Sequence, residues 1–341
     1  MTIDSDKIGI VVIGRNEGAV LDQTLTSVKV QNCSVIYVDS GSTDNSIEIA
    51  KALQVDILCL DDAVPFTAAR AYNAGVQYLM DIHPGVEFIQ FLDGDCELVV
   101  NWLSTAYQAI TADPTVAAVC GRRREKQRDR SVYNLLCDIE WDTPVGEVGV
   151  CVDALMRTEF LAKTKGFRTD LIAGEEPELC FRLRQIGGRV IRLDADSSVH
   201  DAKIYHFSQW WKRSQRGGYA YAEQTWLHRH QSGFYCLKET SGIWIWGFVL
   251  PVLSVVLAIA MPTVGFISTV ILYLTKIFQI SARTAAGTNL AAKEASIYAF
   301  FCLLGKFPEL QGQLQFCLNQ LLGKRQTLIE YKGPDISLEQ H

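Results

Sequence analysis

Short runs of apolar residues alternate with segments of helical pattern through the N-terminal part of the chain. Continuous apolar runs of this kind are typical of strands buried on both faces of a sheet. Strands are expected at residues 8–13, 34–38, 55–60, 87–92, 116–120 and 189–193. Helices are expected at residues 19–28, 68–80 and 179–185, and from the cap residues 42–44 to residue 53. The alternation predicts an α/β fold, with a mostly parallel sheet flanked by helices on both faces.

The composition indicates a globular protein and argues against several functions. An apolar fraction of 48% supplies a core, and a length of 341 residues favours one large domain with an appendage. The net charge of -6 argues against nucleic acid as a partner. The 10 cysteines include no C-x-x-C pair, which suits a reducing compartment and argues against a zinc site. The polar, acidic N-terminus predicts no signal peptide, so we expect this domain in the cytosol.

A long uncharged stretch near the C-terminus predicts helices that enter a membrane. No charged residue occurs between Glu239 and Lys276. Residues 243–260 have the length and the aromatic edge of a spanning helix, which Pro251 should kink, and residues 264–275 form a shorter apolar run. Basic residues lie outside this hairpin and none lies in its turn, so both ends are expected on the cytosolic side. A pair of buried helices in a soluble domain is the alternative.

A helix with one apolar face is expected after the hairpin. Its apolar residues recur at helical spacing: Leu310, Leu314, Cys317, Leu318 and Leu321. This face could lie on a membrane surface or pack on the hairpin, and the sequence supports both. We therefore expect three parts, namely a domain at residues 1–238, a membrane hairpin at 239–281 and an amphipathic helical segment at 282–341.

Two carboxylates separated by a glycine follow the fourth expected strand. Asp93 and Asp95 lie at the carboxyl end of that strand, where parallel sheets bind ligands. Both could face one hard cation, because Mg²⁺ and Mn²⁺ prefer oxygen ligands and bridge to substrate phosphates. An acidic surface turn is the alternative. His200 follows a later strand, and it could be a third metal ligand or a structural histidine.

Two further segments lie at the ends of expected strands. Asp39 ends the second strand, where its carboxylate could accept hydrogen bonds from a base or a ribose, while Asp44 is the better helix cap. The segment 14–17 lacks the glycine spacing of a dinucleotide site and the lysine of a P-loop. This argues against dinucleotide binding and against an ATPase.

Three glutamates, Glu175, Glu176 and Glu178, crowd at the start of another expected helix. Like charges this close raise the pKa of at least one carboxyl group, which suits a general base. Stabilisation of the helix N-terminus is the alternative. With the metal pair, these acids predict a protein that holds a nucleotide diphosphate on a cation and takes a proton from an acceptor, as a sugar-nucleotide transferase does.

The chain resembles the family 2 glycosyltransferases with the GT-A fold over roughly residues 8–220. The resemblance rests on residues 11–17, 38–44, 69–75, 93–95 and 174–183 taken together. It implies that the donor is bound by Gly14, Arg15, Asn16, Glu17, Asp39, Ser40, Arg70, Asn73 and Asp93. It implies that Mn²⁺ or Mg²⁺ is held by Asp93, Asp95 and His200. The base would be Glu176, where the family usually has aspartate, with Glu175 and Glu178 as alternatives.

The resemblance also implies an inverting transfer of one sugar from a nucleotide-diphosphate sugar, by family a UDP-sugar. The Gln-x-x-Arg-Trp motif of processive members is absent, and residues 209–213 only approximate it. Trp141, Asp142 and Glu178 are expected to contact the acceptor. The arginine-rich segment 121–130 is expected to be a solvated loop that closes over the acceptor or attracts acidic lipid.

The membrane hairpin indicates where the acceptor lies. We expect a lipid-linked or envelope glycan at the cytosolic face of the cytoplasmic membrane, with the catalytic domain in the cytosol. One alternative is transfer to polyprenyl phosphate. Another is a non-catalytic scaffold that binds a nucleotide sugar in a polysaccharide assembly, although a scaffold has no use for both Asp95 and Glu176.

Overall fold

The computed structural model describes residues 4–231, 235–288 and 290–324. The chain divides into two compact units, one ending at Lys203 and one beginning at Ile204. The first unit is an α/β domain. The described part of the second unit is helical.

A nine-stranded sheet forms the centre of the first unit, in the order β3-β2-β1-β4-β8-β6-β9-β5, with β7 paired to β9. The strands are β1 (Ile8–Gly14), β2 (Ser34–Asp39), β3 (Asp56–Cys59), β4 (Phe88–Asp93), β5 (Cys96–Leu98), β6 (Val116–Glu125), β7 (Gly146–Glu147), β8 (Leu155–Arg157) and β9 (Arg189–His200). β1 pairs in parallel with β2 and β4, and β2 with β3, as the alternating sequence predicts. Beyond β4 the directions mix, because β8 pairs antiparallel with both β4 and β6.

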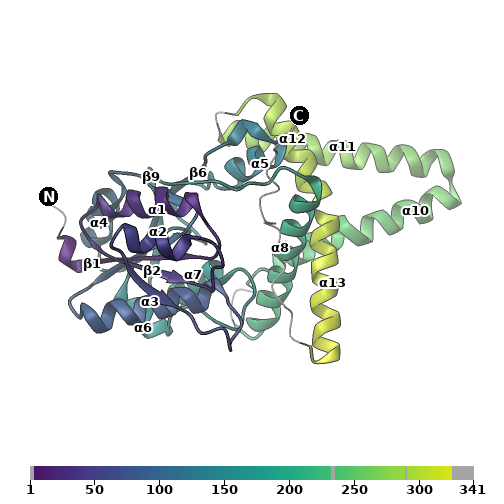
Figure 1. The fold of residues 1–341 in the computed structure, drawn as a ribbon. Helices are drawn as coiled ribbons and strands as arrows, with labels where there is room; N and C mark the ends of the chain where they lie inside the picture. The colour runs from purple at the N-terminus through teal and green to yellow at the C-terminus, as the bar shows by residue number, and fades with distance from the viewer. Residues whose placement is uncertain (1–3, 232–234, 289, 325–341) are drawn as a thin grey trace. The chain divides into compact units, whose positions relative to one another are not determined.

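Helices cover both faces of this sheet, as predicted (Figure 1). The helices of this unit are α1 (Ala19–Lys29), α2 (Ser46–Ala52), α3 (Ala68–Ile82), α4 (Trp102–Ala112), α5 (Val132–Glu140), α6 (Thr158–Thr164) and α7 (Glu175–Gln185), with short 3-10 turns η1 (Ser5–Lys7) and η2 (Arg128–Arg130). Ile10 and Val12 of β1 share a core with α1 and α4, whereas Val11 shares the opposite core with α3 and α7. Successive residues of β1 therefore face opposite sides, which explains why its apolar run is continuous.

The arginine-rich segment 121–130 is not the solvated loop that the sequence predicts. β6 continues through it to Glu125 and pairs in parallel with β9. Arg123 on this strand is only 8% exposed. Its side chain is buried by ion pairs instead of apolar contacts, so the apolar pattern ends before the strand does. β9 likewise runs past its expected end at residue 193 and finishes at His200.

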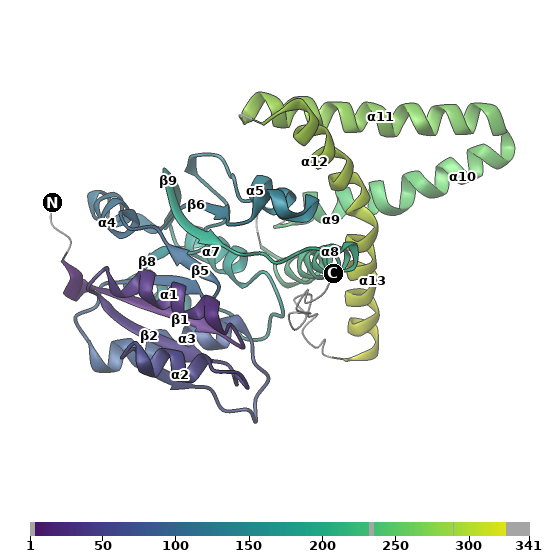
Figure 2. The same cartoon turned by 45° about the horizontal axis from the view of Figure 1, so that its top comes forward.

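In the described part of the second unit, two helical spans are long and apolar enough to cross a membrane by length and composition. The elements of this unit are α8 (Phe207–Leu227), α9 (Leu237–Trp244), the π-helix η3 (Ile245–Val249), α10 (Leu250–Ala260), α11 (Pro262–Gly287), α12 (Ala292–Leu304) and α13 (Lys306–Leu322). The spans are Leu237–Ala260 and Pro262–Gly287, which join at Met261 (Figure 2). Many of their large apolar side chains are exposed, unlike those of a buried pair in a soluble domain.

A π-helical turn, η3, immediately precedes the segment in which Pro251 should kink the first span. A proline ring clashes with the carbonyl four residues earlier in an α-helix, which here belongs to Gly247. Single π-turns of this kind are a recognised cause of helix bending. The local geometry thus accommodates the proline within one continuous apolar span.

The helix expected around Leu310 is α13, and it packs closely on α8. A Cβ added at Gly312 would lie 2.0 Å from the carbonyl oxygen of Gln215, so only glycine allows this approach. Leu310 is buried, but three further residues of the expected apolar face are exposed, namely Leu314, Leu318 and Leu321. One side of α13 therefore packs within the unit, and an apolar row stays uncovered. Residues 325–341, the end of the expected C-terminal segment, lie outside the described residues.

We predict that Gly75→Ala destabilises the first unit. Gly75 lies on α3, and a Cβ there would be 2.4 Å from Val11 Cγ1 of β1 and 3.0 Å from Val38 Cγ2 of β2. Overpacking of this kind costs about 1–3 kcal/mol, so the melting temperature of the full chain in detergent should fall. The control is Gly85→Ala, where the added methyl group meets nothing within 4 Å. Equal melting temperatures for the two variants would contradict the packing described for α3.

Candidate active site

The carboxyl ends of β1, β2 and β4 meet at one edge of the sheet. Gly14 lies beside Asp39 in the register of β1 with β2, and Ile13 lies beside Asp93 in the register of β1 with β4. Three segments that are distant in the sequence are therefore neighbours. Parallel sheets bind ligands at this edge, so the candidate site begins here.

Asp39 is buried and shapes the turn that follows β2. Its Oδ2 accepts hydrogen bonds from the backbone N–H groups of Gly41 (3.0 Å) and Ser42 (2.9 Å), and its Oδ1 accepts one from the Tyr37 hydroxyl (3.0 Å). Gly41 has a φ of +78°, and a Cβ there would lie 2.8 Å from the Phe66 ring. The carboxylate thus fixes a turn whose glycine packs directly on an aromatic side chain.

Asn16 ties the loop after β1 to the same turn. Its backbone N–H donates to Ser42 Oγ (2.9 Å), and its Oδ1 accepts from the Thr43 N–H (2.7 Å). Asn16 has a φ of +58°, a left-handed conformation that asparagine adopts more readily than most residues. The Ser40 N–H donates to the Gly14 carbonyl (3.0 Å). Together these bonds join the two loops into one rim, which we call the β1–β2 rim (residues 14–17 and 39–43).

Arg15 and Arg70 both lie against the Phe66 ring, with their guanidinium carbons 5.5 Å and 5.8 Å from its centroid. Arg70 also donates to the carbonyl groups of Val64 (2.5 Å) and Asp61 (2.8 Å). Arg70 therefore orders the loop after β3, and it brings that loop to the β1–β2 rim through Phe66.

Asn73 connects α3 to the segment before α7. Its side-chain amide donates to the Phe167 carbonyl (2.7 Å) and accepts from the Phe167 N–H (2.9 Å). The Phe167 ring stacks on Tyr72, with the ring centroids 5.2 Å apart. Both polar groups of the Asn73 side chain are thus used in ordering the chain beside the site.

Gly94 allows the turn that carries the two aspartates. Its N–H donates to the Ile13 carbonyl (2.7 Å), and its own carbonyl accepts from the Thr24 hydroxyl (2.9 Å). A Cβ at this position would lie 2.9 Å from the Ile13 carbonyl oxygen and 3.1 Å from Glu17 Cγ. The close approach of two backbones therefore requires glycine, and it places Glu17 beside the turn.

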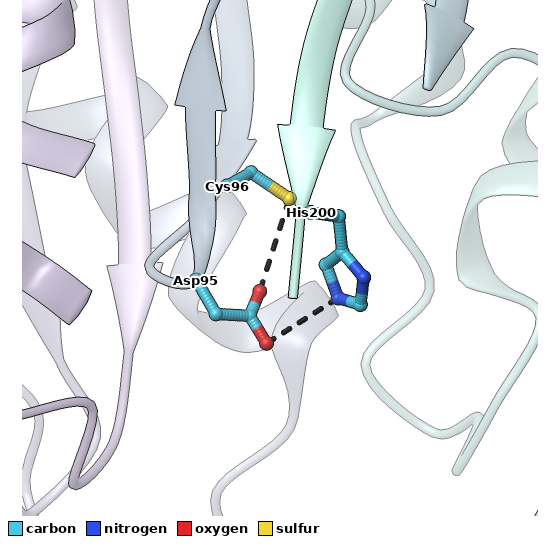
Figure 3. A group of neighbouring side chains, drawn as sticks. All are labelled: Asp95, Cys96 and His200. Carbon is cyan, nitrogen blue, oxygen red and sulfur yellow. Dashed lines mark hydrogen bonds and ion pairs between the residues drawn. The ribbon is translucent and has the colours of Figure 1, made fainter. Parts of the chain in front are cut away.

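Asp93 and Asp95 have different partners. Asp93 accepts hydrogen bonds from the Tyr72 hydroxyl (2.7 Å) and from Arg123 Nη2 (3.3 Å). Asp95 is buried, and its Oδ2 lies 3.3 Å from His200 Nε2 (Figure 3). Asp95 and His200 are thus brought together as the sequence predicts, whereas the carboxylate of Asp93 faces an arginine.

Two groups of described side chains place one ligand atom each within 4.8 Å of one another: Asp95, Cys96 and His200, and Asp93, Cys96 and Asp153. The second group already holds the Arg123 guanidinium, which donates to both Asp153 oxygens (2.6 and 2.7 Å). Thiol sulfur suits softer metals than Mn²⁺ or Mg²⁺, so Cys96 is a poor ligand for either ion. The carboxylate and imidazole of the first group are therefore the donors that fit a divalent cation.

Glu176 lies in the first turn of α7 and is partly exposed. Loss of solvation raises the pKa of its carboxyl group well above the ordinary value. Arg123 opposes this shift, whereas Asp93 and Glu175 reinforce it. A carboxyl group with a raised pKa binds a proton more strongly once ionised, which suits a general base.

Glu178 is a buried structural residue and not the acceptor contact that the sequence predicts. Its carboxylate accepts hydrogen bonds from Arg182 Nε (2.9 Å) and Nη2 (2.7 Å) and is 0% exposed. Arg182 also donates to the carbonyl groups of Thr164 (2.5 Å) and Gly166 (2.8 Å). The pair therefore fastens α7 to the segment after α6, where an acceptor sugar has no access to the carboxylate.

Trp141 lies next to the Asp95–His200 pair. Its ring meets His200 edge-on, with the centroids 4.8 Å apart, and the Arg123 guanidinium carbon lies 5.6 Å from its centroid. Asp142 beside it is held by two arginines, Arg122 (3.1 Å) and Arg192 (3.2 Å). Of these two expected acceptor contacts, Trp141 adjoins the candidate site and Asp142 is engaged in ion pairs.

Four residues of this cluster were missed by sequence reasoning: Tyr72, Arg123, Glu125 and Asp153. Burial raises the pKa of Glu125 to about 7, and its Oε2 lies 4.0 Å from His200 Nδ1. Arg123 belongs to a run of charged residues that is typical of a surface loop. The signal that could have found it is the apolar strand that runs directly into that segment at Cys120.

We predict that Glu178→Gln destabilises the fold by about 3–5 kcal/mol, because it leaves the charge of Arg182 poorly compensated next to a buried amide. The matched control is Glu159→Gln, which breaks an exposed i,i+4 pair with Lys163 and should cost no more than about 1 kcal/mol. Thermal unfolding of the two variants measures both effects. A Glu178→Gln protein that has the melting temperature of the wild type but no longer transfers sugar to the acceptor would support a contact between Glu178 and the acceptor.

Comparison with known proteins is consistent with this geometry. Residues 9–147 match the family model described as glycosyl transferase family 2. A mannosyltransferase from Pyrobaculum calidifontis, solved in complex with GDP-Man and Mn²⁺, is similar over 92% of this chain and 88% of its own, with a TM-score of 0.60 and 16% identity. The TarS fragment 1–349 from S. aureus is similar over 93% and 92% of the two chains, with a TM-score of 0.48 and 14% identity.

No curated protein matches the chain. At 16% identity the mannosyltransferase structure shows a shared fold, and the family model adds the activity class. The chain is therefore a glycosyltransferase with the GT-A fold, and residues 9–147 are the part that matches family 2.

Proposed function

We propose that the chain is an inverting, metal-dependent enzyme that moves one sugar from a nucleotide-diphosphate sugar to a hydroxyl group of a lipid-linked or envelope glycan. The observation that carries this proposal is the setting of Glu176. Its carboxyl group is partly exposed and has a raised pKa, to which the negative charge of Asp93 contributes. Asp93 in turn lies on the same glycine turn as Asp95 of the Asp95–His200 pair.

The β1–β2 rim and its neighbours are the proposed donor site. The residues are Gly14, Arg15, Asn16, Glu17, Asp39, Ser40, Arg70, Asn73 and Asp93. Asp39 uses three of the roughly four acceptor positions of its carboxylate on the protein, so it shapes the rim and keeps about one for a base or ribose. A uridine nucleotide is the family expectation. The GDP-Man in the similar mannosyltransferase makes a guanosine nucleotide the first alternative.

Asp95 and His200 are the proposed holders of Mn²⁺ or Mg²⁺. Their ligand atoms lie 3.3 Å apart, a spacing that two ligands of one ion can adopt. A bound ion would supply positive charge to the departing diphosphate. Asp93, held by Tyr72 and Arg123, is the proposed contact to the nucleotide ribose or to the ion.

Glu176 is the proposed base, with Glu175 as the alternative. Glu176 would take the proton of the acceptor hydroxyl, whose oxygen then bonds to the anomeric carbon as the bond to the diphosphate oxygen breaks. Attack from the face opposite the diphosphate inverts the anomeric centre. Trp141 would present its ring to the acceptor sugar.

The two apolar spans are the proposed membrane anchor. With 24 and 26 residues, they reach roughly 36 and 39 Å, compared with a hydrocarbon core of about 30 Å. Lys276 Nζ lies 5.2 Å from the centroid of the Trp246 ring, an aromatic and basic pair that suits one membrane interface. We propose that residues 239–281 form this hairpin between a catalytic part at 1–238 and a helical segment at 282–341, with the catalytic part in the cytosol.

The direct test is release of nucleoside diphosphate from a panel of sugar nucleotides by the detergent-purified chain with a membrane lipid extract. Release from one donor should require Mn²⁺ or Mg²⁺. Glu176→Gln should lower it by about 100-fold or more, since general bases contribute at least that factor. Asp95→Ala should also lower it strongly, because it removes a proposed ligand of the ion. The control Asp81→Asn, on the exposed side of α3, should keep the wild-type rate.

The other outcomes of this assay favour other assignments. Release that survives Glu176→Gln would move the base to Glu175. A polyprenyl-phosphate sugar as the main product would favour the polyprenyl-phosphate transferase. Tight donor binding without release, even with lipid extract, would favour the scaffold and contradict the proposal.

We also predict that kcat rises with pH. A base acts when ionised, and the raised pKa of Glu176 moves its ionisation above the usual range for glutamate. Activity should therefore be lost on the acid side at a higher pH than for an ordinary glutamate. The measurement is kcat at saturating donor from about pH 5 to about pH 8, at constant ionic strength. A flat profile across this range would contradict the assignment of Glu176.

A further inference from the structure

A buried arginine joins the carboxylates of the site. Arg123 Nε and Nη2 donate to the two oxygens of Asp153 (2.7 and 2.6 Å), and the same Nη2 lies 3.3 Å from Asp93 Oδ2. Asp153 is fully buried, whereas Asp93 is open enough to meet a ligand. The guanidinium therefore links a carboxylate inside the protein to one at the surface of the site.

The inner end of this link is held from several directions. Asp153 has a φ of +47°, a conformation that costs a non-glycine residue energy and persists only when its surroundings enforce it. The Ser198 hydroxyl donates to its carboxylate, and Gln90 Nε2 donates to its carbonyl (2.7 Å). The Trp102 indole N–H in turn donates to Gln90 Oε1 (2.8 Å). Asp153 is thus a fixed point from which Arg123 extends.

The outer end of the link is aligned as well. Asp93 Oδ1 accepts from the Tyr72 hydroxyl while Oδ2 faces Arg123, so both oxygens have a donor. The Trp141 ring lies against the guanidinium. Arg123 also offsets the negative charges that act on Glu176, since it is the charge that lowers the pKa of that carboxyl group. The Arg123 guanidinium therefore contacts the carboxylates of Asp153 and Asp93 and also acts electrostatically on the carboxyl group of Glu176.

We propose that Arg123 is a positioning residue. Asp153 holds the Arg123 guanidinium in one orientation. The guanidinium in turn orients the Asp93 carboxylate for the nucleoside diphosphate of the donor. The inference rests on the proposed function, because it assigns a role toward the donor of that reaction. It predicts that Asp153, which is fully buried, affects donor binding through Arg123.

A direct contact between Arg123 and the diphosphate would be a different role, and Asp153→Asn separates the two. That substitution keeps the positive charge of Arg123 and removes a negative charge beside it. A role through charge alone therefore predicts binding of UDP that is as tight or tighter. A positioning role predicts weaker binding, because the guanidinium loses its bidentate partner.

The experiment is titration calorimetry of UDP, and in parallel GDP, with the full chain in detergent and excess Mn²⁺. We expect Asp153→Asn and Arg123→Gln to weaken binding of the preferred diphosphate by about 10- to 100-fold, as loss of an orienting partner does. Arg123→Lys keeps the positive charge but lacks the planar guanidinium that binds a carboxylate through two nitrogen atoms. Its affinity for the diphosphate should therefore lie between those of these variants and the wild type. Arg124→Gln is the matched control, since Arg124 is the next residue and pairs with Asp196 at the exposed surface.

The outcomes are separable. Wild-type affinity in folded Asp153→Asn, or affinity in Arg124→Gln as low as in Arg123→Gln, would overturn the inference and leave the proposed function intact. A wild-type chain that binds neither diphosphate, with or without Mn²⁺, would contradict the proposed function itself. Thermal unfolding shows which variants are folded, and if Arg123→Gln is not, Arg123→Lys and Asp153→Asn decide the result.

Discussion

The parallel pairing of β1 with β2 and β4 is the constraint on which the site depends. Both faces of these strands are buried, so Ile10 and Val12 pack in one core and Val11 packs in the other. This packing fixes the register in which the strands pair. The register then sets Asp39 and Asp93 at one edge. A shift of the register by one residue would turn each of these side chains toward the opposite core. The packing of the two cores therefore determines where the acids of the site lie.

Acidic residues can gather at this edge because specific partners balance them. Arg123 lies between Asp93 and Asp153, His200 lies beside Asp95, and N–H groups of the turn surround Asp39. An unpaired buried charge costs several kcal/mol, which these contacts offset. Glu176 differs, since its surroundings raise its pKa instead of stabilising the ionised form. The same edge therefore offers acids held by specific partners and one, Glu176, whose carboxyl group binds a proton more strongly than usual.

Much of this arrangement could be predicted from the sequence. The strands buried on both faces are visible as apolar runs, and Asp39, Asp93 and Asp95 follow them directly. The sequence could not show that β6 continues through Arg123, because ion pairs with residues thirty positions away replace the apolar contacts that a pattern records. It also could not show that Glu178 is buried, since the partner Arg182 looks like an ordinary surface neighbour one turn along α7. Pairing between distant charges is a property of the fold and leaves no local pattern.

Asp95 and His200 are proposed to hold the cation that the donor diphosphate meets, beside an Asp93 that Arg123 orients. The most direct measurement is the anomalous scattering of manganese in crystals of the chain grown with Mn²⁺ and its nucleoside diphosphate. One peak within about 2.3 Å of a ligand atom of both Asp95 and His200, in contact with the diphosphate, is the predicted result. A peak between Asp93 and Asp153 with Arg123 displaced, or a diphosphate bound away from the β1–β2 rim, would contradict it.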